Sequence, residues 1–245
     1  MFKNISHKVG YHPIIRIFGS INNFIAPKYC EICRSPIEKD NNPFEFICQR
    51  CFDSMPLAPE PDVIFNRLVQ GFDKDELCIS GAVSLFAMKE DHDYMNAIYS
   101  MKYYGFSRIG AELGKKLGRL LKQYKKINFD ALIPVPIHHA RKRERGYNQS
   151  EFIAKGINEV IGIPVNKKVI KRKKYTQTQT ALSKEERRTN IQNTIIPYYR
   201  NLKLKGGNYL LVDDVLTTGS TLNECANTLL LMGAKKVEVA TLVYA

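Results

Sequence analysis

The sequence predicts an α/β protein in which a parallel sheet is flanked by helices and preceded by a small amino-terminal metal-binding module. Segments with the pattern of strands alternate with segments of helical periodicity from Phe129 onward, an order typical of parallel sheets. Four of the six cysteines lie between Cys30 and Cys51, in two pairs of the form Cys-x2-Cys. A chain of 245 residues is long enough for both units.

Short apolar runs predict the strands, and a period near 3.6 residues predicts the helices. The predicted strands cover residues 79–88, 131–135, 165–170, 209–212 and 237–243. The predicted helices cover residues 94–103 and 109–124, and two more begin near Asn148 and Ser220. In the last helix, Leu222, Cys225 and Leu229 share one face, which predicts that Cys225 is a core thiol.

A passage punctuated by proline, around Pro56 and Pro61, is typical of the exit from a small module. We therefore place a domain boundary near residue 60. The amino-terminal segment and the cysteine module occupy residues 1–60, and the large domain occupies residues 61–245. Within the large domain we expect a cap at residues 61–127 and a core at residues 128–245.

Composition and charge limit the classes of function. No stretch reaches the roughly 18 uninterrupted apolar residues that a membrane helix needs, so we expect no membrane span and a cytoplasmic location. The formal net charge of +13 gathers in basic runs, notably at residues 141–145 and 167–174. Such runs indicate either an anionic partner, phosphate or nucleic acid, or a solvated surface, and charge alone does not choose between them.

The cysteine spacing predicts a structural zinc ribbon. Cys30, Cys33, Cys48 and Cys51 form two tight pairs separated by 14 residues, a spacing suited to tetrahedral Zn²⁺. Disulfide pairs are the alternative, which a cytoplasmic location disfavours. Cys78 lies beside a predicted strand, and we expect it to be structural.

The segment YLLVDDVLTTGST, from Tyr209 to Thr221, carries the strongest chemical pattern. A buried strand ends in two carboxylates, Asp213 and Asp214, and a Thr/Gly/Ser loop then enters a helix. Successive N–H groups and hydroxyls of residues 217–221 can surround one phosphate, with the positive end of the helix dipole behind them. Adjacent carboxylates repel each other unless donors or a cation face them, and ribose hydroxyls or Mg²⁺ would serve. The alternative is an ordinary strand, turn and helix cap with solvated aspartates.

This order of strand, paired acids, TTGST loop and helix resembles the 5-phosphoribosyl-1-pyrophosphate (PRPP) signature of type I phosphoribosyltransferases. The chain is more narrowly similar to the ComF family, phosphoribosyltransferase-like proteins associated in bacteria with natural competence, whose relatives include the GntX proteins. The similarity covers residues 28–243. Beside the cysteine pairs and the loop, it rests on KYYG with Lys102 and Gly105, on PVPIHHARKRERGYNQ at residues 134–149, and on Thr176, Gln179, Leu182, Arg187 and Asn190.

The resemblance implies a type I phosphoribosyltransferase fold that binds PRPP together with Mg²⁺. Asp213 and Asp214 would hold the ribose hydroxyls, and in an enzyme they are the catalytic candidates. The implied phosphate ligands are Thr217, Thr218, Gly219, Ser220 and Thr221. The implied pyrophosphate ligands include Arg143 and Arg145, and further PRPP contacts are Lys102 and Arg172. Arg172 belongs to a polar stretch, residues 171–190, that resembles the loop closing over PRPP in this superfamily.

The turn at residues 136–149 leaves several roles open. At His139 the family usually has proline, so the sequence of this turn departs from the family pattern at that position. His138 and His139 are either catalytic or exposed spectators. Asn148 is either a ligand or the cap of the following helix.

Two classes of function follow. In one, the chain is a PRPP-binding protein of DNA uptake and transformation that also binds single-stranded DNA and works with competence-machinery proteins. Arg172, Lys173 and Lys174 would contact the phosphates, and the tyrosines at positions 103, 104, 147 and 175 would either stack on bases or pack inward. The alternative is an active Mg²⁺-dependent phosphoribosyltransferase that displaces pyrophosphate with an unidentified acceptor. A pyrophosphate-release assay distinguishes the two.

Overall fold

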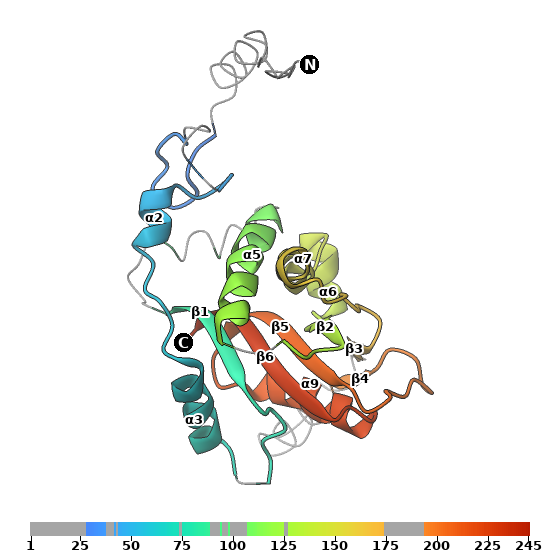
Figure 1. Ribbon diagram of the computed structural model, residues 1–245. Helices are drawn as coiled ribbons and strands as arrows, with labels where there is room; N and C mark the ends of the chain where they lie inside the picture. Colours follow the sequence, from blue (N-terminus) through green and yellow to red (C-terminus); the bar gives the residue numbers. More distant parts are fainter. Residues whose placement is uncertain are drawn as a thin grey trace, which may run out of the picture.

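The structure is a computed structural model that describes residues 28–37, 42, 44–73, 75–88, 94, 98, 107–124, 127–173 and 194–245 (Figure 1). Its helices are α2 (Gln49–Asp53), α3 (Pro61–Gly71), α5 (Ser107–Tyr124), α6 (His139–Arg145), α7 (Gln149–Ile161) and α9 (Ser220–Leu231). Its strands are β1 (Ala82–Ala87), β2 (Ala131–Pro134), β3 (Ile170–Arg172), β4 (Ile195–Pro197), β5 (Asn208–Leu216) and β6 (Lys236–Tyr244). Predicted helix 94–103 lies largely outside the described residues.

The main sheet is parallel, as the alternation of elements predicted. Its four strands lie in the order β1, β6, β5 and β2. Leu211 at the centre of β5 pairs with Ile133 of β2 on one side and with Val239 of β6 on the other. Strand β5 therefore lies inside the sheet, with a paired strand along each of its edges. Its two faces are covered by the two hydrophobic clusters.

One predicted strand is wrong. Within residues 165–170, Val165 makes only an isolated bridge to Leu132, and the chain then bends through residues 167–169. Lys167 and Lys168 are both exposed, and a chain that keeps two successive lysines in solvent cannot run on as a buried strand. Strand β3 begins only at Ile170, and it pairs antiparallel with β4 in a separate two-stranded sheet.

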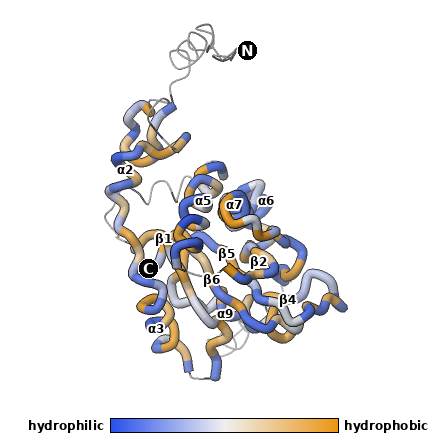
Figure 2. The backbone as a smooth tube through the Cα atoms, in the orientation of Figure 1, coloured by the Kyte–Doolittle hydropathy of each residue, from blue (hydrophilic) through white to orange (hydrophobic). Residues whose placement is uncertain are grey.

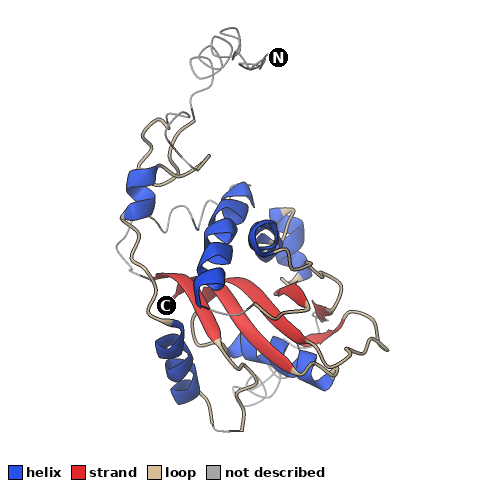
Figure 3. Ribbon diagram, in the orientation of Figure 1, coloured by secondary structure: helices blue, strands red, loops and turns tan. Residues whose placement is uncertain are grey.

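Helices cover both faces of the main sheet, which gives three layers (Figure 3). On one face, α5 and α7 pack on side chains that include Leu85, Leu132 and Leu210. On the other, α3 and α9 pack on a second cluster that includes Leu211 and Val239. The hydropathy colours follow this arrangement, with apolar residues along the strands (Figure 2). Cys225 is fully buried in the second cluster, as predicted.

The interval 61–127, which the sequence predicts to be a cap, supplies β1 in its described part. This is an edge strand of the main sheet whose register with β6 runs from Ala82 opposite Val239 to Ala87 opposite Tyr244. Five of the six residues of β1 are buried. Because such a strand has apolar side chains on both faces, it is stable only within a layered sheet. The boundary near residue 60 stays a prediction, and α3 begins at Pro61.

Two helices on one face of the sheet approach each other closely. A β-carbon added at Gly156 of α7 would lie 2.0 Å from the carbonyl oxygen of Ala111 in α5. One added at Gly114 of α5 would lie 2.3 Å from the carbonyl oxygen of Ile153 in α7. These distances show that the backbones themselves are in contact, so the position of α7 is fixed by α5.

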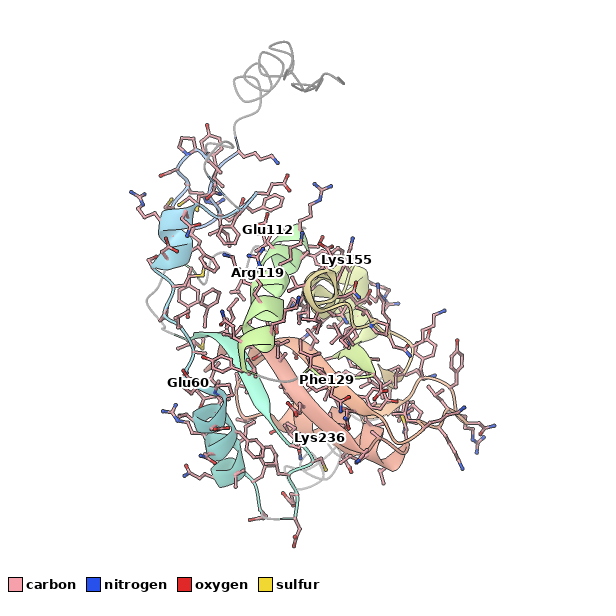
Figure 4. All side chains as sticks on the ribbon, in the orientation of Figure 1. Glu60, Glu112, Arg119, Phe129, Lys155 and Lys236 are labelled. Atoms are coloured by element: carbon pink, nitrogen blue, oxygen red, sulfur yellow. The ribbon has the colours of Figure 1, made fainter. Side chains whose placement is uncertain are left out.

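The cysteine module packs against the amino-terminal part of α5. Glu112 of α5, labelled in Figure 4, accepts a hydrogen bond from the backbone N–H of Glu45 at 2.5 Å. The Lys116 ammonium lies 4.6 Å from the ring centroids of both Phe44 and Phe52. Burial raises the pKa of Glu112 and lowers that of Lys116. The module and the sheet domain therefore share one hydrophobic cluster.

None of the described helices is long and apolar enough to cross a bilayer.

Candidate functional site

The loop between β5 and α9 has the geometry of an anion cradle. Gly219 precedes the first residue of α9 with φ of 76°, in the left-handed region that favours glycine. It is buried, and a β-carbon there would lie 2.8 Å from Leu68 Cδ2. The hydroxyls of Thr218 and Ser220 lie 3.0 Å apart. Exposed hydroxyls and the first N–H groups of a helix thus converge at one point.

The paired acids lie beside this loop and are held by α7. Ser150 Oγ donates to Asp213 Oδ1 at 2.8 Å, and Gln149 Nε2 donates to Asp214 Oδ2 at 3.2 Å. Asp214 is only 6% exposed, whereas Asp213 is half-buried. Neither of the two donors was singled out from the sequence. Both stand in the first turn of α7, and Gln149 is also the last residue of the PVPIHHARKRERGYNQ segment.

Asn148 is the cap that starts α7. Its Oδ1 accepts the backbone N–H of Ser150 at 3.2 Å, while its Nδ2 donates to the carbonyl oxygen of Val135 at 2.9 Å. The side chain is 5% exposed, so both of its polar ends are engaged within the protein. This geometry favours the capping role over the ligand role, and it ties the acid-holding helix to the end of β2.

The turn at residues 136–149 contains a short helix, α6. His138 is its N-cap, with Nδ1 accepting the backbone N–H of Ala140 at 3.2 Å. His139 is the first helical residue, the position where proline is also well accommodated because its N–H has no intrahelical partner. The departure from the family pattern at this position is therefore compatible with the same turn.

A hollow of about 300 Å³ opens where these parts meet. The predicted residues that line it are Asp213, Asp214, the loop residues 217–221, Arg145 and Arg172. Arg143 is exposed and is not among the lining residues, whereas Arg141 of the same short helix is. Lys102 lies outside the described residues. Of the two arginines predicted in this turn, Arg145 therefore lines the hollow and Arg143 does not.

Arg172 connects two sides of the hollow. Its Nη2 donates to Thr221 Oγ1 at 3.4 Å, and its Nε is buried without a hydrogen-bond partner within the described part of the chain. With Arg141 and Arg145, it sets three guanidinium groups against the two carboxylates of the lining. A buried guanidinium nitrogen with an open hydrogen-bonding position fits a polyanionic ligand whose oxygens bind bidentately.

The two-stranded sheet that carries Arg172 is hydrogen-bonded to α9, the helix that follows the phosphate loop. Glu224 of α9 accepts the backbone N–H groups of Thr194 at 2.5 Å and of Ile195 at 3.0 Å. Ile195 pairs with Arg172 across β3 and β4. The polar stretch joining these strands, residues 174–193, lies outside the described residues, and with it the predicted Lys174, Thr176 and Gln179.

The four module cysteines gather as a tetrahedral metal site requires. Their sulfur atoms all lie within 4.8 Å of one another, and Cys33 Sγ is 3.8 Å from Cys48 Sγ. Tetrahedral Zn²⁺ with Zn–S bonds near 2.3 Å places its sulfurs about 3.8 Å apart, so this donor set fits zinc. A hydrogen bond from Ser35 lowers the pKa of Cys33 to about 6, whereas burial raises that of Cys51. All six cysteines are free.

Among the predicted DNA contacts, Arg172 and Lys173 are described and Lys174 is not. Tyr147 packs against Phe152 with ring centroids 5.6 Å apart, which supports the inward alternative. The tyrosines at positions 103, 104 and 175 lie outside the described residues. Sequence reasoning missed Tyr198 and Tyr199, which follow β4 and stack edge to face at 4.9 Å.

Comparison with known proteins finds matches over the part of the chain that carries this site. The family model of the phosphoribosyl transferase domain matches residues 144–245, the part that contains α7, both acids and the phosphate loop. Competence protein F of Haemophilus influenzae is 38% identical over 110 residues, 45% of this chain and 48% of that protein. The DNA utilization protein YhgH of Escherichia coli O157:H7 is 36% identical over a segment of the same length, 47% of that protein. The chain thus spans about half the length of these relatives.

Two further similarities have a lower sequence identity. Competence protein ComFC of Bacillus subtilis is 27% identical over 219 residues, 88% of this chain and 84% of that protein. Among solved structures, a glutamine phosphoribosylpyrophosphate amidotransferase from B. subtilis superposes with a TM-score of 0.39 and 22% identity, covering 54% of this chain and 26% of that one.

Proposed function

We propose that the chain is a phosphoribosyltransferase-like protein of the ComF type, that it binds PRPP with Mg²⁺ in the 300 Å³ hollow, and that it acts in the use of incoming DNA. Its matched domain and its relatives support this proposal. The 5′-phosphate would bind the loop at residues 217–221. The ribose hydroxyls would face Asp213 and Asp214, and the pyrophosphate would face the arginines of the turn.

The convergence of the two acids with the phosphate loop carries this proposal. Holding two adjacent carboxylates together costs free energy because their charges repel each other. The cost falls when a cation or the donors of a ligand face them. Here Ser150 and Gln149 hold both carboxylates beside the exposed hydroxyls of the loop, at the carboxyl end of β5. That edge of a parallel sheet is where ligands of such folds bind. The acids are also suited to Mg²⁺, which binds through one or two carboxylates together with ligand phosphates.

The arginines add the charge that pyrophosphate requires. Arg141, Arg145 and Arg172 reach the hollow from two different elements, α6 and β3, so they can contact separate oxygens of one ligand. Planar guanidinium groups bind such oxygens bidentately, which ammonium groups do not. Arg141 therefore stands beside Arg145 in this proposal, and Arg143, which does not line the hollow, is left out.

The same basic surface supports single-stranded DNA as a second partner. Lys171, Arg172 and Lys173 continue from the hollow along the two-stranded sheet, and the relatives carry names that refer to competence and DNA utilization. We also propose a structural Zn²⁺ on Cys30, Cys33, Cys48 and Cys51, and a cytoplasmic location, because a reducing compartment keeps clustered thiols available for a metal.

A thermal-shift experiment tests PRPP binding. PRPP with Mg²⁺ is expected to raise the unfolding midpoint, because a ligand that binds only the native state stabilises it by mass action, by about 2.7 kcal/mol at a hundredfold excess over Kd. Asp213→Asn combined with Asp214→Asn is expected to abolish most of that rise.

A matched pair of substitutions controls for charge. Asp53→Asn combined with Asp62→Asn removes the same two charges from exposed positions outside the hollow, and it should leave the PRPP response intact. An equal response in the Asp213/Asp214 double variant would show that the acidic pair does not hold the ribose. No response in the unmodified protein would refute PRPP binding itself.

A further inference from the structure

A second, smaller hollow lies beside the PRPP candidate site. Its volume is about 140 Å³, and its apolar walls are formed by Pro134, Pro136, Ile137, Ile170 and Tyr198. Pro136, Ile137 and Arg172 line both hollows, so the two cavities share one wall. This smaller hollow belongs to none of the roles assigned above.

The rim of the smaller hollow is strongly basic. Lys142, Lys167, Lys171 and Arg172 line it, against the single carboxylate of Glu151. Lys167 Nζ lies 2.7 Å from Glu151 Oε2, and Lys142 Nζ lies 3.7 Å from Glu151 Oε1. Glu151 therefore draws two lysines from different parts of the chain toward the opening, and the rim keeps an excess of positive charge.

Tyr198 is fixed as part of the wall. Its backbone N–H donates to the carbonyl oxygen of Val169 at 2.8 Å, beside the start of β3. The Lys171 ammonium lies 5.3 Å from the centre of its ring. An ammonium near an aromatic ring holds the ring by a cation–π interaction, which limits the rotamers of both side chains.

We propose that this hollow takes one unstacked base of a single-stranded DNA, while the lysines of the rim contact the neighbouring phosphates. This inference rests on the proposed binding of single-stranded DNA, and it assigns one base of that DNA to the smaller hollow. An aromatic ring among apolar side chains accepts the face of any base, and a basic track beside it follows the backbone, which is the usual construction of single-strand sites.

The size and charge of the hollow restrict the occupant. A volume of about 140 Å³ is below the roughly 300 to 1,000 Å³ that hold a complete small-molecule ligand, so a single ring fits better than a whole nucleotide. The bases of a duplex are stacked and cannot enter such a hollow. A strand bound here would pass directly beside the pyrophosphate side of the PRPP candidate site, because the wall between them is shared.

The experiment compares two fluorescent oligomers of equal length at low salt by anisotropy. One is oligo(dT), and the other has the same number of phosphates but abasic sugars. The unmodified protein is expected to bind oligo(dT) about 5- to 150-fold more tightly, the range that one stacked base supplies. Tyr198→Ala should remove this preference, and Tyr198→Phe, which keeps the ring, should retain it.

Tyr124→Ala is the matched control, because Tyr199 contacts the ring of Tyr198 and is not independent of it. Tyr124 is 44% exposed at the end of α5 and is not part of the lining, so its loss should leave the preference for bases unchanged. The unfolding midpoint of Tyr198→Ala and its response to PRPP with Mg²⁺ should match those of the unmodified protein.

Different failures separate the two proposals. Equal binding of both oligomers by the unmodified protein, or a preference that survives Tyr198→Ala, overturns the base site and leaves single-strand binding in place. No binding of either oligomer at low salt overturns the base site together with the proposed DNA partner. The PRPP response reports on the larger hollow independently of both.

Discussion

Among single residues, Gly219 is the one whose backbone conformation the phosphate loop requires most strictly. Its φ of 76° costs a residue with a β-carbon about 1–2 kcal/mol. Gly219→Ala is therefore expected to lower the free energy of unfolding by about that amount, and to reduce the rise in midpoint with PRPP and Mg²⁺, because the loop backbone must shift. Thermal unfolding with and without ligand measures both effects.

Gly206→Ala separates backbone strain from loss of the ligand site. Gly206 has φ of 70°, and no atom lies within 4 Å of the position of its β-carbon. It is expected to lose comparable stability, about 1–2 kcal/mol, while keeping the full PRPP response. If both variants responded to PRPP equally well, the loop at residues 217–221 would not be the phosphate site.

The sequence predicted the candidate site residues that lie together in one continuous segment. Asp213, Asp214 and Gly219 could be assigned because the strand, the acids and the loop are contiguous. Ser150 could not, because its contact with Asp213 spans 63 positions and depends on where α7 lies. The choice between Arg141 and Arg143 depends on the rotation of a seven-residue helix, which an arginine-rich run does not specify.

Between helices, the contact of α5 with α7 determines where the acid-holding side chains stand. Gly156→Ala is expected to destabilise the protein by about 3 kcal/mol, because a β-carbon 2.0 Å from the Ala111 carbonyl oxygen must push two backbones apart. The PRPP response should weaken as well, since α7 carries Ser150 and Gln149. Urea unfolding and the ligand-induced shift measure the two consequences.

Gly71→Ala provides the comparison for a helical glycine without a close neighbour. No atom lies within 4 Å of its added β-carbon, so this change should be neutral or stabilising by up to about 1 kcal/mol. Similar stability of the two variants would mean that the backbone contact between α5 and α7 does not hold the helices in place.

The elements that the sequence located well are those with a strong period. The helix predicted at 109–124 is found at Ser107–Tyr124, and the strand predicted at 131–135 is found at Ala131–Pro134. Gly114 and Gly118 mark the face of α5 that contacts α7, a signal that the sequence carries in their spacing of four residues. The place of β1 in the sheet could not be predicted, because pairing with β6 joins segments about 150 positions apart in the chain.

For the chain as a whole, the cysteine module should contribute to the stability of the sheet domain. Purified protein is expected to hold about one zinc per chain, and chelation should lower the midpoint of a single unfolding transition, because the module and α5 share one hydrophobic cluster. Cys48→Ser should lose the metal, whereas Cys78→Ser, outside the cluster, should retain it. Elemental analysis and calorimetry make the measurement, and an unchanged midpoint after complete chelation would contradict the structural role.

The net charge of +13 bears on how DNA binds, because counterion release makes affinity depend on salt. If about four phosphates are neutralised, the logarithm of affinity should fall against the logarithm of salt with a slope near −3, at about 0.7 per contact. Replacing Lys171, Lys173 and Lys174 with alanine should flatten this slope by about 2 for every sequence tested. Arg172 is left in place because it lines the PRPP candidate site.

A triple variant at Lys122, Lys125 and Lys126 removes the same charge from the end of α5 and the residues after it. If DNA crosses the mouth of the two hollows, this variant should keep nearly the full slope, because Lys122 lines neither hollow and Lys125 and Lys126 follow it in the chain. The opposite result, a slope flattened by this variant and unchanged by the first, would move the DNA site to α5. The two triple variants have the same net charge, so any difference between their slopes reports the position of the strand and not the total charge of the protein.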